Sequence, residues 1–233
     1  MSQNRADIFA HPDSNIFEEF SAVVVLDDDA MLCRMMCESL ADRFRNTVVL
    51  GFIHPETSLP VINQLYFDIV ISDINMPGLW GDKIIAQVKN ISPTTFTAAM
   101  TGFSIETAYA AGKAQPDFFF DKNKGMDPLW PALEKGFKTA KERRERIFST
   151  YLDESLTAFS KPHWRERGEL KQHLGFSLTE YFRSIRTIKA MALLKLKKNM
   201  TQEELAIISG HSSSQYLKEN LKEISRHITL PDL

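Results

Sequence analysis

The sequence predicts an α/β fold, a doubly wound five-stranded parallel sheet, followed by an all-α domain. Up to Pro128, short apolar runs alternate with segments of helical spacing, as in βα units. Beyond it only helical patterns remain. The charge divides near the same place, because residues 1–140 hold 11 Lys+Arg and 18 Asp+Glu, whereas residues 141–233 hold 17 and 12. An acidic first part and a basic second part indicate two modules.

Five apolar runs have the length of buried strands, and they span residues 23–26, 48–52, 67–72, 96–100 and 118–120. The segments between them favour helices over residues 31–40, 55–64, 82–88 and 105–114. Such alternation predicts a parallel sheet with helices on both faces. In this architecture, ligands bind outside the carboxyl ends of the strands.

Polar side chains follow four of these runs. They are Asp27, Asp28 and Asp29 after the first, Asp73 after the third, Thr101 after the fourth, and Asp121 and Lys122 after the fifth. Carboxylates crowded at one sheet edge repel one another unless a hard divalent cation binds among them, and a nearby lysine also offsets their charge. We therefore expect this edge to hold Mg²⁺ beside an acceptor carboxylate and to stabilise phosphoryl oxygens as they arrive.

The stretches VVVLDDDAMLCRM, FDIVISDINMPGLWG, AAMTG and DFFFDK resemble the receiver domain of two-component response regulators. The resemblance covers about residues 21–140, in the family's order and spacing. It implies a receiver (flavodoxin-like) fold, Mg²⁺ as cofactor, and a sensor histidine kinase as phosphoryl donor.

By this resemblance, the metal ligands are Asp27, Asp28 (which binds Mg²⁺ directly), Asp73 and the backbone carbonyl of Asn75. Asp73 is the phosphoryl acceptor, Thr101 and Lys122 engage the phosphoryl group, and Phe119 is the aromatic switch that rotates with Thr101. Two positions depart from the family pattern: Asn123 replaces the usual proline after the lysine, and Gly102 replaces the more usual alanine after the threonine.

A Mg²⁺-dependent phosphatase with Asp73 as its nucleophile is a rival interpretation of the same acids. Such an enzyme needs a general acid two residues after the nucleophile, where this chain has Asn75. We therefore expect a receiver and not an enzyme.

The C-terminal part contains two short helices around a glycine turn. Thr201 and Glu204 form a capping box at the start of the first helix, whose apolar face would be Leu205 and Ile208. The second starts near Ser213, and its predicted core residues are Tyr216, Leu217, Leu221 and Ile224. This pattern fits a helix-turn-helix, and it fits a bare αα-hairpin equally well.

The stretches GFSLTEYFRSIRTIKAMALL and MTQEELAIISGHSSSQYLKENLKEI resemble the DNA-binding half of AraC-type transcription factors, over about residues 155–233. The resemblance implies DNA as a partner and a helix-turn-helix whose second helix reads the major groove. The candidate contacts are Ser213, Ser214 and Gln215 for base edges, and Lys218 and Lys222 for phosphates. Glu219 stands where the family usually has arginine, so a protein-interaction module is the alternative.

The expected domains are an N-terminal tail (1–20), the receiver (21–140), a linker helix (141–154) and the AraC-type domain (155–233). Residues 129–151 favour one long helix with apolar residues in a 3-4 alternation. This stripe fits either a seam between two copies or the last receiver helix packed on its own sheet. We expect a homodimer.

No apolar stretch reaches the roughly 18 residues that a membrane span needs, and the N-terminus lacks the layout of a signal peptide. We therefore expect a cytoplasmic protein without a membrane partner. Cys33 and Cys37 lie four residues apart in a predicted helix, and we expect them to be reduced.

Overall fold

The computed structural model describes residues 20–77, 81–102, 112–158, 164–196 and 200–226. Its centre is one parallel sheet of five strands in the order β2-β1-β3-β4-β5. The strands are β1 (Ser21–Leu26), β2 (Thr47–Phe52), β3 (Ile69–Asp73), β4 (Phe96–Thr101) and β5 (Phe118–Asp121). The predicted sheet is therefore confirmed, with each strand within two residues of its expected bounds.

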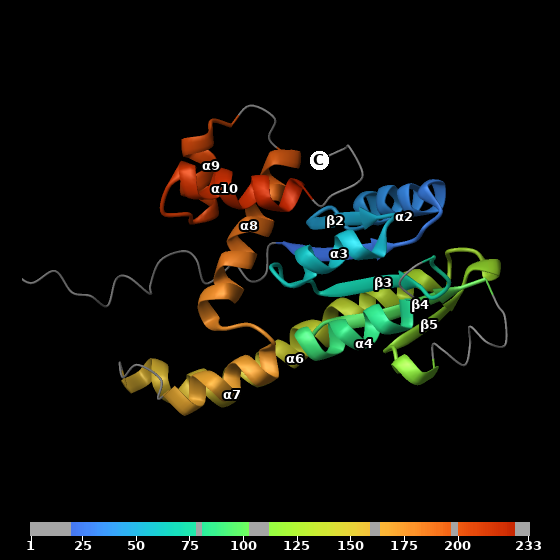
Figure 1. Ribbon diagram of the computed structural model, residues 1–233. Coiled ribbons are helices and arrows are strands. Elements are labelled where there is room, and N and C mark those ends of the chain that lie inside the picture. The colour runs from blue at the N-terminus through green and yellow to red at the C-terminus, as the bar shows by residue number, and fades with distance from the viewer. Residues whose placement is uncertain (1–19, 78–80, 103–111, 159–163, 197–199, 227–233) are drawn as a thin grey trace, which may run out of the picture.

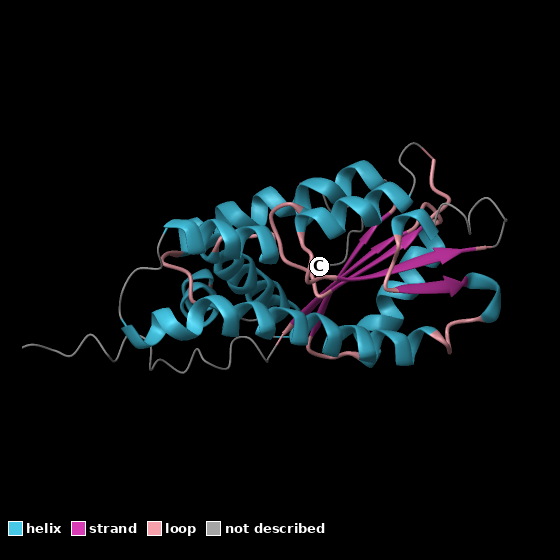
Figure 2. Ribbon diagram, turned by 90° about the horizontal axis from the view of Figure 1, so that it is seen from below, coloured by secondary structure: helices cyan, strands magenta, loops and turns pink. Residues whose placement is uncertain are grey.

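Helices cover both faces of the sheet (Figures 1 and 2). On one face lie α3 (Pro55–Ile62) and α4 (Gly81–Ile91), and on the other lie α2 (Ala30–Arg43) and α6 (Leu129–Ala158). Side chains of β1 alternate between the two cores, since Val24 packs with the first pair of helices and Val25 with the second. Both are fully buried, and each such side chain stabilises the fold by roughly 1.5–3 kcal/mol. The helix predicted over 105–114 lies largely outside the described residues.

The C-terminal half contains α7 (Trp164–Leu174), α8 (Leu178–Leu196), α9 (Gln202–Ser209) and α10 (Ser214–Ser225). The predicted capping box is confirmed: Thr201 Oγ1 accepts the Glu204 N–H, and a Glu204 carboxylate oxygen accepts the Thr201 N–H. Gly210 ends α9 in the left-handed region, at φ 78°. Two short helices therefore meet at a glycine turn, as expected.

Two predicted core residues of this pair are exposed, and Leu221 is partly buried. The buried face of α9 consists of Leu205, Ala206 and Ser209, which leaves Ile208 at its edge and 43% exposed. On α10, Leu217 and Ile224 are buried, whereas Tyr216 is 40% exposed. The apolar pattern identified the helices correctly but assigned these two side chains to the wrong surface.

Helix α6 runs without a break through the predicted receiver–linker border at residue 140. Its apolar stripe packs on its own chain, because Leu133 and Ala140 are buried against the sheet and Ile147 packs beside Tyr66. Of the two interpretations of this stripe, the structure therefore shows the last receiver helix packed on its own sheet. The predicted homodimer stays a prediction, and it needs a surface other than this face of α6.

Within the described part of the chain, every helix is too short or too polar to cross a membrane.

Candidate functional site

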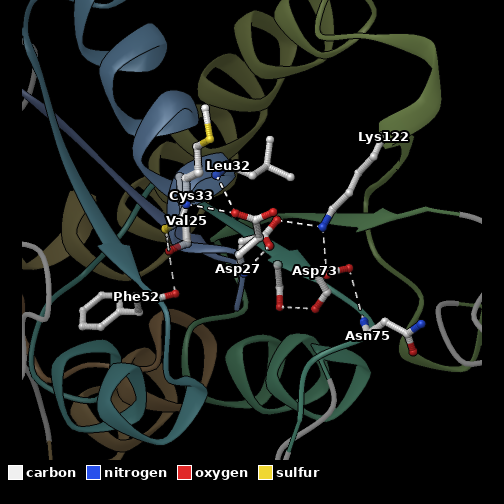
Figure 3. A network of polar contacts seen from close by, with 11 residues as sticks. Val25, Asp27, Leu32, Cys33, Phe52, Asp73, Asn75 and Lys122 are labelled. Carbon is white, nitrogen blue, oxygen red and sulfur yellow. Dashed lines mark hydrogen bonds and ion pairs between the residues drawn. The ribbon is translucent and has the colours of Figure 1, made fainter.

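The candidate site lies where β1 and β3 end side by side in the middle of the sheet (Figure 3). Because Leu26 pairs with Ser72, the acids that follow, Asp27 and Asp73, are neighbours. Asp27 is fully buried and Asp73 is 5% exposed, whereas Asp28 faces solvent. One carboxylate oxygen from each of the three lies within 4.8 Å of the others. The predicted gathering of acids at the sheet edge is thus present.

Lys122 completes this cluster from the end of β5. Its Nζ lies 2.7 Å from Asp27 Oδ2 and 2.8 Å from Asp73 Oδ2. Burial raises the pKa of Asp27, and so does the neighbouring charge of Asp73, while Lys122 opposes both effects. Burial lowers the pKa of Lys122, but hydrogen bonds to Asp27 and Asp73 outweigh it and raise that pKa. One protonated lysine therefore neutralises part of the charge of two buried acids.

The backbone around Asp73 is held in a tight turn. The Asn75 N–H donates to Asp73 Oδ1 at 3.2 Å, and the Ser72 hydroxyl donates to the Asp73 carbonyl at 2.9 Å. At Gly81, the first residue of α4, a Cβ would overlap the Asp73 carbonyl oxygen. A glycine is required there because α4 begins directly against the backbone of the candidate acceptor.

Thr101 and Phe119 belong to the two strands beyond β3. Asp73 pairs with Met100, so Thr101 ends β4 at the same edge as Asp73, and it is fully buried. Phe119 is half-buried and packs against a small cluster near Ile74 and Ala99. The sheet therefore brings the predicted site residues to one edge, and their individual roles stay predictions.

The two residues that depart from the receiver pattern contact each other. The side-chain amide of Asn123 donates to the Gly102 carbonyl at 3.0 Å and to Asp121 Oδ1 at 3.1 Å. The turn that carries Lys122 is thereby tied to the residue that follows Thr101. The sequence marked both positions as unusual, but only the structure shows that they form a pair.

A family model described as the response regulator receiver domain matches residues 23–134. Residues 23–134 form a response regulator receiver domain. The match contains every residue of the acidic edge described above.

Relatives of this receiver domain support the same assignment. The transcriptional regulatory protein ZraR of Salmonella typhimurium (strain LT2) is 28% identical to this chain over 121 residues. These residues are 52% of this chain and 27% of ZraR. ZraR of Salmonella typhi matches with the same identity and coverage. The chain thus spans about a quarter of the length of these curated relatives. The solved receiver domain of an HD domain-containing protein from Pseudomonas fluorescens Pf-5 has a TM-score of 0.51 and 17% identity, and it covers 55% of this chain and 94% of its own. This structural likeness supports the fold alone.

The candidate DNA-contact residues lie on α10 and just before it. Three have partners within the chain: Ser213 caps α10 by accepting the Tyr216 N–H, Ser214 Oγ lies 3.4 Å from Glu203 Oε1, and Gln215 Nε2 donates to Glu219 Oε1 at 2.6 Å. The other two, Lys218 and Lys222, are exposed. Glu219 therefore pairs with its own helix, and the two lysines are the cations that α10 presents to solvent.

Sequence reasoning missed the polar groups at the opposite edge of the receiver sheet. Arg143 forms an ion pair with Asp117, and Arg144 forms one with Asp68. A signal was available, because Asp117 directly precedes the predicted strand run 118–120, Asp68 interrupts the run 67–72, and Arg144 interrupts the apolar stripe. The sequence did not show which arginine meets which acid.

We predict that Lys122→Met destabilises the receiver domain by roughly 3 kcal/mol, because it leaves two buried carboxylates without their counter-charge. Losing Lys122 also raises the pKa of Asp27 further. A carboxyl group whose pKa is raised in the folded state destabilises the folded protein more as the pH rises and the group must ionise. The stability lost in Lys122→Met should therefore be larger near pH 7 than near pH 4, where the carboxyl is partly protonated. Urea unfolding at both pH values measures it.

The exposed Lys124→Met variant is the matched control and should change the free energy of unfolding little at either pH. An equal loss for Lys122→Met at both pH values would contradict the proposed coupling to Asp27.

Proposed function

We propose that the chain is a response regulator whose Asp73 accepts a phosphoryl group from a sensor histidine kinase. The observation that carries this proposal is the Asp73 carboxylate at the end of β3, with the Lys122 ammonium at 2.8 Å and Asp27 and Asp28 beside it. An Asp73 oxygen attacks phosphorus, the bond from phosphorus to the donor's imidazole nitrogen breaks, and an acyl phosphate forms. The transferred group carries several negative oxygens, which an ammonium already in place can stabilise.

The residues present fit a hard divalent cation. Asp27, Asp28 and Asp73 supply carboxylate oxygens, the ligand type that Mg²⁺ prefers, and the Asn75 carbonyl is the proposed fourth ligand. When bound, Mg²⁺ offsets the negative charge of the acids and of the incoming phosphoryl group. Lys122 meanwhile orients one Asp73 oxygen through their hydrogen bond.

Phosphorylation converts the Asp73 carboxylate into an acyl phosphate, a group with greater charge and more acceptor oxygens. We propose that Thr101 and Lys122 bind this group and that Phe119 follows Thr101. A phosphatase with Asp73 as its nucleophile is the weaker account, because Asn75 lacks the ionisable proton that a general acid needs.

For the C-terminal half we propose DNA binding as an AraC-type transcription regulator. Support comes from the capped helix pair, its glycine turn, and Lys218 and Lys222 on the exposed side of α10. ZraR is called a transcriptional regulatory protein, although its match is about the length of the receiver domain.

A protein-interaction module is the second candidate for this half. Ile207 on α9 is 76% exposed and Tyr216 on α10 is 40% exposed, and apolar surface of this kind is common where proteins dock. Glu203, Glu204 and Glu219 are also exposed, and acids facing DNA phosphates weaken binding.

We predict that a small phosphoryl donor with Mg²⁺ adds one phosphate to the chain and that Asp73→Asn abolishes it, because an amide is too weak a nucleophile to attack phosphorus. Intact-protein mass spectrometry measures the addition. Asp127→Asn, at an exposed acid away from the cluster, is the control and should be labelled like the wild type. Equal labelling of Asp73→Asn would sink the assignment.

Divalent metal should stabilise the receiver domain, because an ion that binds only the folded site shifts the unfolding equilibrium. We predict a higher melting temperature in millimolar Mg²⁺, and loss of that increase on chelation or in Asp28→Ala. Calorimetry with and without Mg²⁺ measures it, again with Asp127→Asn as the control. A normal Mg²⁺ response in Asp28→Ala would mean that the metal binds elsewhere.

For DNA binding, Lys218→Ala should lower the slope of log affinity against log salt by about 0.9, because one phosphate contact releases about one counterion. Titrations of random-sequence duplex at several salt concentrations measure the slope. Lys138→Ala, at an exposed lysine of α6, is the control. If neither Lys218→Ala nor Lys222→Ala changes DNA affinity, the protein-interaction module becomes the better account.

A further inference from the structure

The turn that follows β5 carries Lys122 to the acidic cluster. The pairing of β4 with β5 ends at Thr101 and Asp121, and beyond this pair the chain enters one 3-10 turn over Lys122–Lys124. From the first residue of that turn, the Lys122 ammonium reaches both buried acids (Figure 3). The last pair of a strand ladder opens more easily than the pairs inside it. The spacing between Thr101 and Lys122 is therefore set at the weakest point of this ladder.

The side chain of Asn123 adds a bond one step beyond the last strand pair. Its Nδ2 donates to the Gly102 carbonyl at 3.0 Å and to Asp121 Oδ1 at 3.1 Å, and its backbone N–H donates to the same Asp121 oxygen at 2.9 Å. A carbonyl and a carboxylate only accept hydrogen bonds, so both contacts need the amide nitrogen. The amide therefore joins the residue after Thr101 to the residue before Lys122.

Gly102 gives this bond its importance. A Cβ at Gly102 would meet open space, and its backbone lies outside the left-handed region, so neither crowding nor conformation requires a glycine there. Glycine has more backbone freedom than any other residue. Without a restraint, the chain could leave β4 in several directions directly after Thr101. The Asn123 amide removes this freedom by holding the Gly102 carbonyl.

We propose that Asn123 is a positioning residue for phosphoryl transfer to Asp73, and that it acts by fixing the spacing between Thr101 and Lys122. The role rests on the proposed function, because those two side chains are the ones proposed to bind the phosphoryl group. Lys122 is already held by two ion pairs, so the amide contributes by placing the Thr101 end against it. Groups that act on one reacting centre must be held in place beforehand, and a misplacement of about 1 Å can slow a reaction about a hundredfold.

The rate of acyl phosphate formation on the full chain tests this role. With phosphoramidate as the donor and Mg²⁺ present, Asn123→Ala should lower the maximal rate by about tenfold. The half-saturating donor concentration should stay unchanged, because the amide does not bind the donor. Intact-protein mass spectrometry follows the reaction over a series of donor concentrations. Asn90→Ala, at an exposed asparagine of α4, is the matched control and should react at the wild-type rate.

An aspartate at position 123 separates hydrogen bonding from size. Asn123→Asp keeps the shape of the side chain, but a carboxylate cannot donate, and its charge repels the Gly102 carbonyl and Asp121. We expect this variant to react no faster than Asn123→Ala. Thermal melting of each variant checks that it is folded at the assay temperature. A wild-type rate in Asn123→Asp would mean that the side chain only fills space, and it would overturn the proposal.

Removing the Thr101 hydroxyl tests whether the amide acts on spacing. Thr101→Val keeps the shape of this buried side chain and deletes the hydroxyl. In that background Asn123→Ala should slow the reaction much less, because Lys122 then acts alone and its own ion pairs hold it. An equal slowing in both backgrounds, or a wild-type rate in Asn123→Ala, overturns the positioning role. If the wild-type chain takes no phosphate on Asp73, the proposed function itself fails and the positioning role falls with it.

Discussion

The buried carboxylates of Asp27 and Asp73 are the constraint on which the receiver domain depends. Two acids withdrawn from water repel each other, so the fold must supply a cation, and Lys122 supplies it from β5. In the sheet, β4 separates β5 from β3, so the two strands lie roughly 10 Å apart. The lysine must therefore reach across the end of β4. The order of the strands and the point where each one ends bring the three residues of this ion cluster together.

Much of this arrangement could be predicted from the sequence, because the signals are local. Apolar runs ending in acids located the strands and their shared edge, and the Thr201–Glu204 box marked the start of α9. Contacts between residues that are far apart in the sequence could not be predicted in the same way. In the sequence, the stripe on α6 is equally compatible with a second copy and with its own sheet. Only the burial of Leu133 and Ala140 against the sheet distinguishes the two. Ile208 lies at the edge of the buried face of α9, and the apolar pattern alone did not show that its side chain faces solvent.

Helix α10 combines features that favour different partners. Lys218 and Lys222 suit an anionic ligand, whereas the pairing of Gln215 with Glu219 occupies an amide that could otherwise reach a base. The exposed side of the helix therefore has little excess charge of either sign. Recognition by such a surface depends more on shape and on freed side chains than on long-range attraction. For this reason, the orientation in which α10 is presented matters as much as its composition.

The position of Arg144 has a consequence for how far this receiver domain extends. The family match ends at residue 134, ten residues before the arginine that neutralises Asp68 and meets the Tyr66 ring. A fragment cut at the family border carries a buried carboxylate whose counter-charge has been left on the discarded piece. A chimera joining this receiver to another output domain at that border inherits the same defect. We therefore expect a stable receiver domain of this protein to need α6 at least as far as Arg144.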